Sequence, residues 1–249
     1  MANPPQSPIS HLREIVSQLR APGGCPWDRE QTMKSITPHI IEEAYELVDA
    51  IEKNNLNLVK EELGDVLLHI AMLSEMAEET NDFTMDDVAQ SACDKMIRRH
   101  PHVFGDATAK TANDVIHHWE AIKSKETQSA FFDSIPDALP ALQKAHKIQK
   151  KAARIGFDWP DITSTIEKVE EEINEVKEEL AHTPPNSEAL FEEIGDLLFS
   201  MVNVIRKLDI LPEDALRAAN KKFTSRFYQM EALAKKNGTP LTQLNVDEQ

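Results

Sequence analysis

Apolar side chains recur at helical spacing along almost the whole chain. Between residues 36 and 51, and again between 58 and 70, they fall three or four positions apart, as on the buried face of an amphipathic helix. The segments 169–180 and 190–205 repeat this pattern. No segment alternates apolar and polar side chains in the way that predicts a half-buried strand. The pattern therefore predicts an all-α fold.

An acidic motif occurs four times, in two pairs. Glu-Glu-Ala-Tyr-Glu at 42–46 precedes Glu-Glu-Leu-Gly-Asp at 61–65. Glu-Glu-Ile-Asn-Glu at 171–175 precedes Glu-Glu-Ile-Gly-Asp at 192–196 in the same way. Each pair spans a plausible turn between two helices. Such a duplication indicates two tandem copies of one helical unit.

A basic segment follows each pair of acidic motifs. Lys95 and Arg99 come after the first pair, and Lys222 and Arg226 have the same spacing after the second. Basic side chains four residues apart share one face of a helix and are suited to clamping phosphate groups. Such a pair alone is typical of an exposed helix face, and its recurrence after the acidic motifs adds weight to a phosphate-binding role.

The charge of the chain is strongly negative in both halves. Its 249 residues include 43 Asp and Glu against 27 Lys and Arg, which gives a net charge of −16. This balance lacks the basic footprint of nucleic-acid and membrane-surface proteins, so we expect neither kind of partner. The polar run at 125–129 separates the repeats, and we expect an N-terminal domain over 1–128 and a C-terminal domain over 129–249.

Two further counts restrict the class of protein. Only seven glycines argue against a Gly-rich phosphate loop. Cys25 and Cys93 are far apart in the sequence and form no Cys-x-x-Cys pair, which favours free thiols in a reducing compartment. No apolar stretch approaches the ~20 residues needed to cross a bilayer. We therefore expect a cytoplasmic location.

The second acidic motif of each pair lies on an unusually apolar helix. The segment 66–73 is apolar almost all round, which is typical of a buried helix. Its acidic turn is therefore expected at the lip of a cavity. Gly64 and Gly195 fall inside these helices, where glycine costs about 1 kcal/mol relative to alanine, and we attribute both to a close approach of helices.

Paired carboxylates on neighbouring helices predict a metal site. Two like charges 4 Å apart repel by about 4 kcal/mol at an effective dielectric constant near 20, so such clusters persist when a cation fills them. Hard oxygen ligands suit Mg²⁺ or Mn²⁺. The pairs spaced i,i+3 are Glu43 with Glu46, Glu62 with Asp65, Glu172 with Glu175, and Glu193 with Asp196.

Three flanking segments complete a family signature. They are Cys-Pro-Trp-Asp-Arg-Glu-Gln-Thr at 25–32, Arg-Arg-His-Pro-His-Val-Phe at 98–104 and Ile-Gln-Lys-Lys-Ala-Ala-Arg-Ile-Gly-Phe-Asp-Trp at 148–159. With the four acidic motifs, they make the chain resemble the two-repeat MazG type of the all-α nucleoside triphosphate pyrophosphohydrolases. The resemblance covers nearly the whole chain.

The resemblance implies hydrolysis of a nucleoside triphosphate between its α- and β-phosphates, with Mg²⁺ as cofactor. It also implies a homodimer in which each repeat contributes to a four-helix bundle. By motif position, the metal ligands would be Glu172, Glu175, Glu193 and Asp196. Glu171 and Glu192 would orient or deprotonate the attacking water, and Lys168, Lys222 and Arg226 would hold phosphates. Glu43, Glu46, Glu62 and Asp65 would form a second metal site.

Several interpretations stay open at the level of sequence. His39 stands in the first repeat where the second has Lys168, so we expect the C-terminal repeat to be the hydrolytic one. We interpret Trp27, Trp119 and Trp159 as packing residues, with base stacking as the alternative for the first and last. The functional alternatives are a dedicated dNTP or phosphoribosyl-ATP pyrophosphohydrolase and a helical regulator that binds nucleotide or a partner protein without turnover.

Overall fold

The computed structural model describes residues 7–126, 130–238 and 241. Within these residues the regular secondary structure is helical and includes no strand, which confirms the all-α prediction. None of these helices is long and apolar enough to cross a membrane. The helices are α1 (Pro8–Arg20), α2 (Pro26–Glu30), α3 (Met33–Glu52), α4 (Leu56–Glu79), α5 (Met85–Arg99), α6 (Pro101–Phe104), α7 (Ala112–Glu126), α8 (Ala141–Arg154), α9 (Ile162–Ala181), α10 (Ser187–Lys207) and α11 (Pro212–Lys236).

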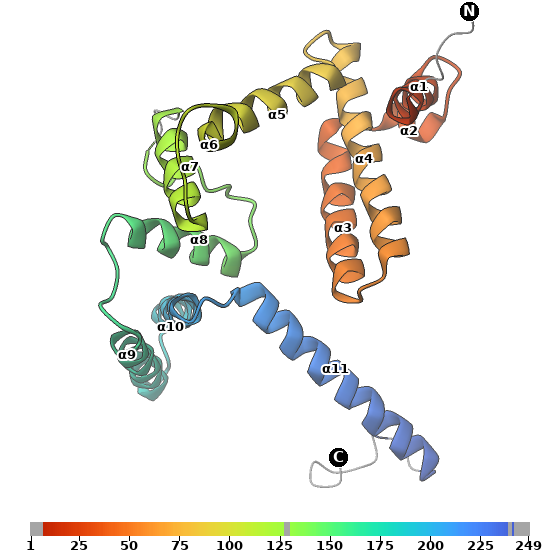
Figure 1. Ribbon diagram of the computed structural model, residues 1–249. Helices are drawn as coiled ribbons and strands as arrows, with labels where there is room; N and C mark the ends of the chain where they lie inside the picture. The colour runs from red at the N-terminus through yellow and green to blue at the C-terminus, as the bar shows by residue number, and fades with distance from the viewer. Residues whose placement is uncertain (1–6, 127–129, 239–240, 242–249) are drawn as a thin grey trace, which may run out of the picture. The chain divides into compact units, whose positions relative to one another are not determined.

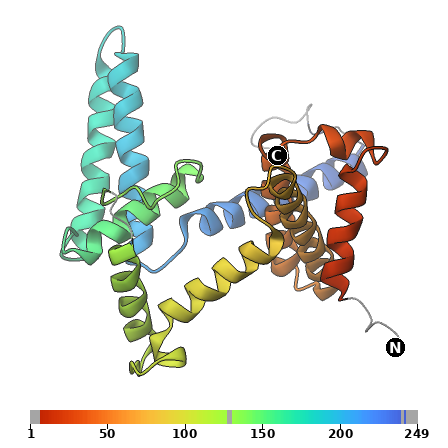
Figure 2. The same ribbon diagram turned by 90° about the horizontal axis from the view of Figure 1, so that it is seen from above.

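The chain divides into two units, Met1–Glu126 and Thr127–Gln249. The predicted boundary between 128 and 129 falls in residues 127–129, outside the described residues. Each unit is built on a hairpin of two long helices, α3 with α4 (Figure 1) and α9 with α10 (Figure 2). A shorter helix packs on the second member of each hairpin, α1 on α4 and α8 on α10. We call α1, α3 and α4 copy one, and α8, α9 and α10 copy two.

Side-chain caps fix where the first helix of each hairpin begins. Thr32 caps α3 in a reciprocal pair with Ser35, and Asp161 caps α9 by accepting the backbone N–H of Ser164. These caps satisfy amide groups that would otherwise lack partners. Glu43 and Glu172 each follow their cap by eleven residues, so the first acidic motif occupies the same turn in both copies.

The second helices begin in the same way. Asn55 accepts two backbone N–H groups at the start of α4, and Asn186 does so at the start of α10. Glu62 and Glu193 each follow their asparagine by seven residues. Because the four caps set an equal register, each hairpin brings its two acidic motifs to the same level.

The buried residues of the two copies differ in polarity. Copy one has a small apolar core in which the central side chains are Val16 from α1, Ile36 from α3, and Ala71, Met72 and Met76 from α4. Copy two buries mostly polar residues, namely Gln149, Thr165, Glu172 and Ser200, together with Val202. The two copies therefore share one backbone arrangement, but the residues buried between the helices are apolar in copy one and mostly polar in copy two.

The apolar second helices are less buried than the sequence predicts. Within the segment 66–73, Ala71 and Met72 are buried but Ile70 is 40% exposed, so the expectation of a buried helix is confirmed on one face and wrong on the other. Leu63, about two turns before Ile70, is 52% exposed. A Cβ atom added to Gly64 or Gly195 would meet nothing within 4 Å, so the expected close approach of helices is also wrong here. Both corrections have one physical reason, because within the described residues of each unit no helix of that unit covers the outer face of its hairpin.

Candidate metal and phosphate site

Three carboxylates meet between α9 and α10. One oxygen each of Glu172, Glu175 and Glu193 lies within 4.8 Å of the others, and we call these residues the copy-two cluster. Glu172 is only 3% exposed, whereas Glu175 and Glu193 are half-buried. Three acidic side chains this close form an all-oxygen set of the kind that hard divalent cations prefer.

A single lysine pairs with the most buried member of the cluster. Lys168 Nζ lies 2.7 Å from Glu172 Oε1 and 2.8 Å from Glu171 Oε1. These contacts raise the pKa of Lys168 above its usual range, so the ammonium stays charged. Glu172 Oε2 is buried and has no hydrogen-bond partner. A buried, unpaired carboxylate oxygen is costly, and a bound cation would relieve that cost.

Burial and mutual repulsion perturb the remaining members of the cluster. Partial burial raises the pKa of Glu193, and the carboxylates of Glu172 and Asp196 raise it further. Partial burial and the neighbouring Glu172 also raise the pKa of Glu175. Both shifts mean that the charged forms destabilise one another, which is the electrostatic condition for binding a cation.

The fourth predicted ligand and the two predicted catalytic residues lie around the cluster. Asp196 is outside the group of three but lines the same cavity as Glu172 and Lys168, a space of about 340 Å³. Glu171 and Glu192 are exposed beside it. The predicted acidic residues thus lie in one region of the structure. Asp196 is outside the group of three oxygens but lines the same cavity.

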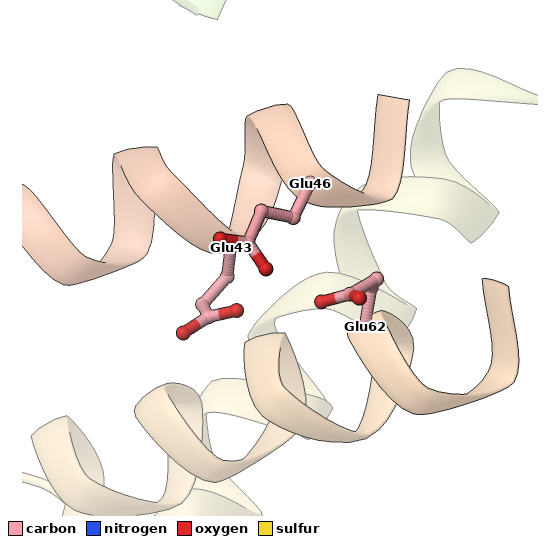
Figure 3. Close-up of side chains that lie close together, drawn as sticks. All are labelled: Glu43, Glu46 and Glu62. Atoms are coloured by element: carbon pink, nitrogen blue, oxygen red, sulfur yellow. The ribbon is translucent and has the colours of Figure 1, made fainter. Parts of the chain in front are cut away.

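Copy one contains a matching group of carboxylates. Glu43, Glu46 and Glu62 point toward one another between α3 and α4 (Figure 3), with one oxygen of each within 4.8 Å of the others. We call them the copy-one cluster. Partial burial raises the pKa of Glu62, as do the charges of Glu46 and Asp65. Asp65 stands outside the group of three, as Asp196 does in copy two.

The surroundings of the two clusters differ most at one position. His39 replaces Lys168, and its Nδ1 lies 3.8 Å from Glu42, too far for a hydrogen bond. Its ring stacks on His69 with 6.1 Å between centroids, and His69 Nε2 lies 3.7 Å from Glu43. His69 was not among the residues predicted from the sequence, although its position relative to the motif Glu-Glu-Leu-Gly-Asp matches that of Ser200 in copy two.

The predicted phosphate ligands on α11 are not brought to the copy-two cluster. Lys222 and Arg226 are exposed, and neither lines the cavity that contains Glu172 and Lys168. The helix itself packs on α8 and α10. Of the three predicted phosphate-binding residues, Lys168 alone contacts the cluster in the described part of the chain.

The tryptophans divide into one packed ring and two exposed ones. Trp119 lies 5.2 Å from the Arg99 guanidinium and 5.1 Å from the His100 ring, as expected of a packing residue. Trp27 is 54% exposed and Trp159 is 43% exposed, so the interpretation of these two as packed side chains is wrong. Trp159 instead lines the cavity of the copy-two cluster.

Comparison with known protein families identifies the repeat. The model of the MazG nucleotide pyrophosphohydrolase domain matches twice, over residues 31–104 and 161–230. Each match contains both acidic motifs of one hairpin. The two matches together cover more than half of the chain.

Curated relatives align over nearly the whole length. The chain is 45% identical to the nucleoside triphosphate pyrophosphohydrolase/pyrophosphatase MazG of Thermotoga maritima, over 96% of this chain and 91% of that protein. It is 41% identical to the nucleoside triphosphate pyrophosphohydrolase of Escherichia coli K12, over 96% of this chain and 93% of the relative. The similarity therefore includes both copies.

Proposed function

Because this chain belongs to the MazG nucleotide pyrophosphohydrolase family, we propose that it hydrolyses ribo- and deoxyribonucleoside triphosphates to monophosphate and pyrophosphate. The observation that carries the proposal is the copy-two cluster, with its buried, unpartnered Glu172 oxygen and the ammonium of Lys168 beside it. The two free thiols, Cys25 and Cys93, fit the cytoplasmic location that we propose for this activity.

The donor set fits Mg²⁺ or Mn²⁺ as cofactor. Glu172, Glu175 and Glu193 would hold the cation, with Asp196 within the same cavity. When bound, a divalent cation supplies Lewis-acid stabilisation of the charge that develops on the phosphates. The copy-one cluster offers a comparable set of oxygens, so we propose a second cation site there.

The residues of the chain contribute proton transfer and charge. In the proposed reaction a water oxygen attacks the α-phosphorus, the bond from that phosphorus to the bridging α–β oxygen breaks, and pyrophosphate leaves. Glu171 and Glu192 are exposed carboxylates beside the cluster, and we propose that they accept the proton of the water. Lys168 holds Glu171 and Glu172 in place and supplies the positive charge nearest to the phosphates.

We assign hydrolysis to copy two. The copy-two cluster is paired with a lysine that stays charged, whereas His39 and His69 lie at longer distances from the acidic residues of copy one. Lys53 lines the cavity of Glu46 and Glu62, but it is paired with Asp49. An anionic triphosphate requires positive charge beside the carboxylates, and the ammonium of Lys168 supplies it 2.7 Å from Glu172 Oε1. Copy one is therefore proposed as the weaker or regulatory site.

We also propose that the protein is a homodimer. Exposed apolar side chains run down α9 at seven-residue spacing, and others run down α10 at alternating spacings of three and four. On α9 they are Ile166, Ile173 and Leu180, and on α10 they are Phe191, Ile194, Leu198 and Met201. Such a seam on a two-helix hairpin is half of the core of a four-helix bundle, and a second copy of the hairpin completes it.

Product analysis over a panel of nucleotides tests the activity. With Mg²⁺ present, we expect monophosphate and pyrophosphate from ATP, GTP, CTP and UTP and from their deoxy forms. Release of diphosphate and phosphate would contradict the proposal, and no turnover on any member would leave the protein as a regulator that binds nucleotide without turnover. Turnover restricted to dNTPs or to phosphoribosyl-ATP would instead identify a dedicated enzyme.

A matched pair of variants tests the assignment to copy two. Glu193→Gln should lower kcat by about 100-fold or more, because even partners that only orient metal ligands cost 10- to 100-fold when removed. Glu62→Gln, at the equivalent position of copy one, should leave pyrophosphate release within about threefold of wild type. The reverse pattern would transfer the activity to copy one.

A further inference from the structure

The two copies allow a comparison of equivalent buried positions within one chain. Counted from the acidic motifs, Ile36 of α3 corresponds to Thr165 of α9, and Met72 of α4 corresponds to Asn203 of α10. In copy one, Ile36 and Met72 belong to the apolar core. In copy two, Thr165 and Asn203 line the cavity next to the cluster. Copy two thus has polar side chains and a cavity at the positions where copy one has packed apolar side chains.

The helix that packs on each hairpin shows the same exchange. The buried residue of α1 is Val16, whereas that of α8 is Gln149. Gln149 is 7% exposed, and its Nε2 donates a 2.8 Å hydrogen bond to the backbone oxygen of Phe199. Since a carbonyl can only accept, this bond fixes the orientation of the amide. Gln149 Oε1 is left buried without a partner, which marks a place where a donor is missing.

The unpartnered glutamine lies in the wall of a second cavity. This cavity has a volume of about 660 Å³ and is lined largely by aromatic and aliphatic side chains, including Phe131 and Phe157. It shares Trp159, Phe199 and Asn203 with the smaller cavity that contains the cluster. A space of this size with aromatic walls and a few polar groups has the character of a site for a small organic molecule.

The loop that carries the aromatic side chains is anchored to α10. Asp158, between Phe157 and Trp159, pairs with Arg206 and with Lys207, whose Nζ lies 2.8 Å from the carboxylate. Lys207 also donates to the backbone oxygen of Trp159. These contacts fix the backbone that carries Trp159, a residue that lines both cavities.

We propose that this aromatic cavity of copy two binds the nucleoside part of the substrate, with its triphosphate directed to the copy-two cluster. This assignment rests on the proposed function and adds the residues that read the base and sugar. The rings of Trp159 and Phe199 stack on the base. Gln149 holds the backbone of Phe199 through its 2.8 Å hydrogen bond. Asn203 offers an amide donor to the base, since its Oδ1 already accepts from Arg206. Every nucleobase presents acceptors, so this donor favours broad base selectivity.

Substitutions that restore the copy-one residues test the cavity. Asn203→Met places the side chain of Met72 at its equivalent position, and Gln149→Val removes the amide that bonds the backbone of Phe199. Each should raise KM for ATP by about three- to tenfold, the loss expected for one hydrogen bond, and leave kcat within about twofold. Trp159→Ala should raise KM by about 10- to 100-fold, as expected from losing a stacked base. Gln143→Leu, on the same helix but outside the cavity lining, should change neither.

Calorimetric titration separates base binding from phosphate binding. With Mg²⁺ present, the three cavity variants should bind AMP more weakly than wild type by the same factors and should bind inorganic pyrophosphate unchanged. Equal weakening for AMP and pyrophosphate, unchanged AMP binding, or a loss of dimer mass in place of a KM effect would overturn the proposal. If wild type released no pyrophosphate from any triphosphate, the proposed function would fail, while the AMP titration would still decide whether the cavity binds a nucleoside.

Discussion

At the scale of single residues, Lys168 and Glu172 form the electrostatic centre of copy two. Glu172 is nearly inaccessible to solvent, and one of its oxygens depends on Lys168 while the other has no partner. Removing one member of a buried ion pair leaves an uncompensated charge, which usually costs 3–5 kcal/mol. The cost here is smaller, because the side chain of Lys168 is 29% exposed and water can approach it.

This dependence predicts a metal-sensitive stability for Lys168→Met. In EDTA we expect the variant to lose about 1–2 kcal/mol of unfolding free energy, because Glu172 is left without a cation. Added Mg²⁺ or Mn²⁺ should stabilise the variant more than wild type, since the cation then supplies the only positive charge for Glu172. Urea unfolding with and without metal measures both effects, and Lys177→Met on the same helix is the control. A variant as stable as wild type in EDTA would show that Lys168 does not compensate the buried charge.

At the scale of elements, a carboxylate at the end of α7 joins this helix to α5. Glu126 lies 2.6 Å from both Arg98 Nε and Arg99 Nη2. The two guanidinium groups hold the pKa of Glu126 at about 2, below the ordinary 4.5. Arg99 also lies against Trp119 of α7, so a charged pair and a cation–π contact act together on one helix junction.

The lowered pKa predicts how the stability of this junction depends on pH. A group with a depressed folded-state pKa stabilises the fold fully above its unfolded-state pKa and loses that contribution as pH falls through the folded value. For Glu126 the window runs from about pH 4.5 down to about pH 2. Wild type should therefore exceed Glu126→Gln in stability at pH 7, and the difference should shrink toward zero near pH 2.

Fluorescence of Trp119 measures this difference locally. In a background with Trp27→Phe and Trp159→Phe, the remaining indole reports on the junction because it contacts Arg99 and His100. Urea midpoints of wild type and Glu126→Gln in this background would be compared at pH 7, 5 and 3. A gap between the two midpoints that does not narrow at low pH would contradict the prediction.

At the scale of the whole molecule, local patterns predicted the acidic hairpins well. The caps, the helical spacing and the duplicated motifs are all local, and they fix the register that brings Glu172 and Glu193 together. The aromatic cavity was not predicted, because Gln149 and Trp159 meet Phe199 only through packing across 40 to 50 positions of sequence. The exposure of Leu63 was not predicted for another reason. A helix that is apolar on most sides needs a covering surface, but the sequence does not indicate which chain supplies that surface.

The apolar seam of α9 and α10 is the surface that the proposed dimer would bury. Within the described residues its exposed side chains are Ile166, Ile173 and Leu180 of α9 and Phe191, Ile194, Leu198 and Met201 of α10. Removing this apolar surface from water would favour association with a second copy.

Substitution in the middle of this seam tests the proposed dimer. Leu198 is 52% exposed, and Leu198→Glu would place a charge in the core of the four-helix bundle, so we expect the solution mass to fall from twice 28.1 kDa to 28.1 kDa. Val103→Glu, at a position that is 63% exposed on α6, should keep the wild-type mass. The unfolding midpoint of wild type should also rise with protein concentration, because association stabilises only the folded chain. Light scattering that gives wild type the mass of one chain, with a midpoint independent of concentration, would rule out the dimer and leave the seam without a covering surface.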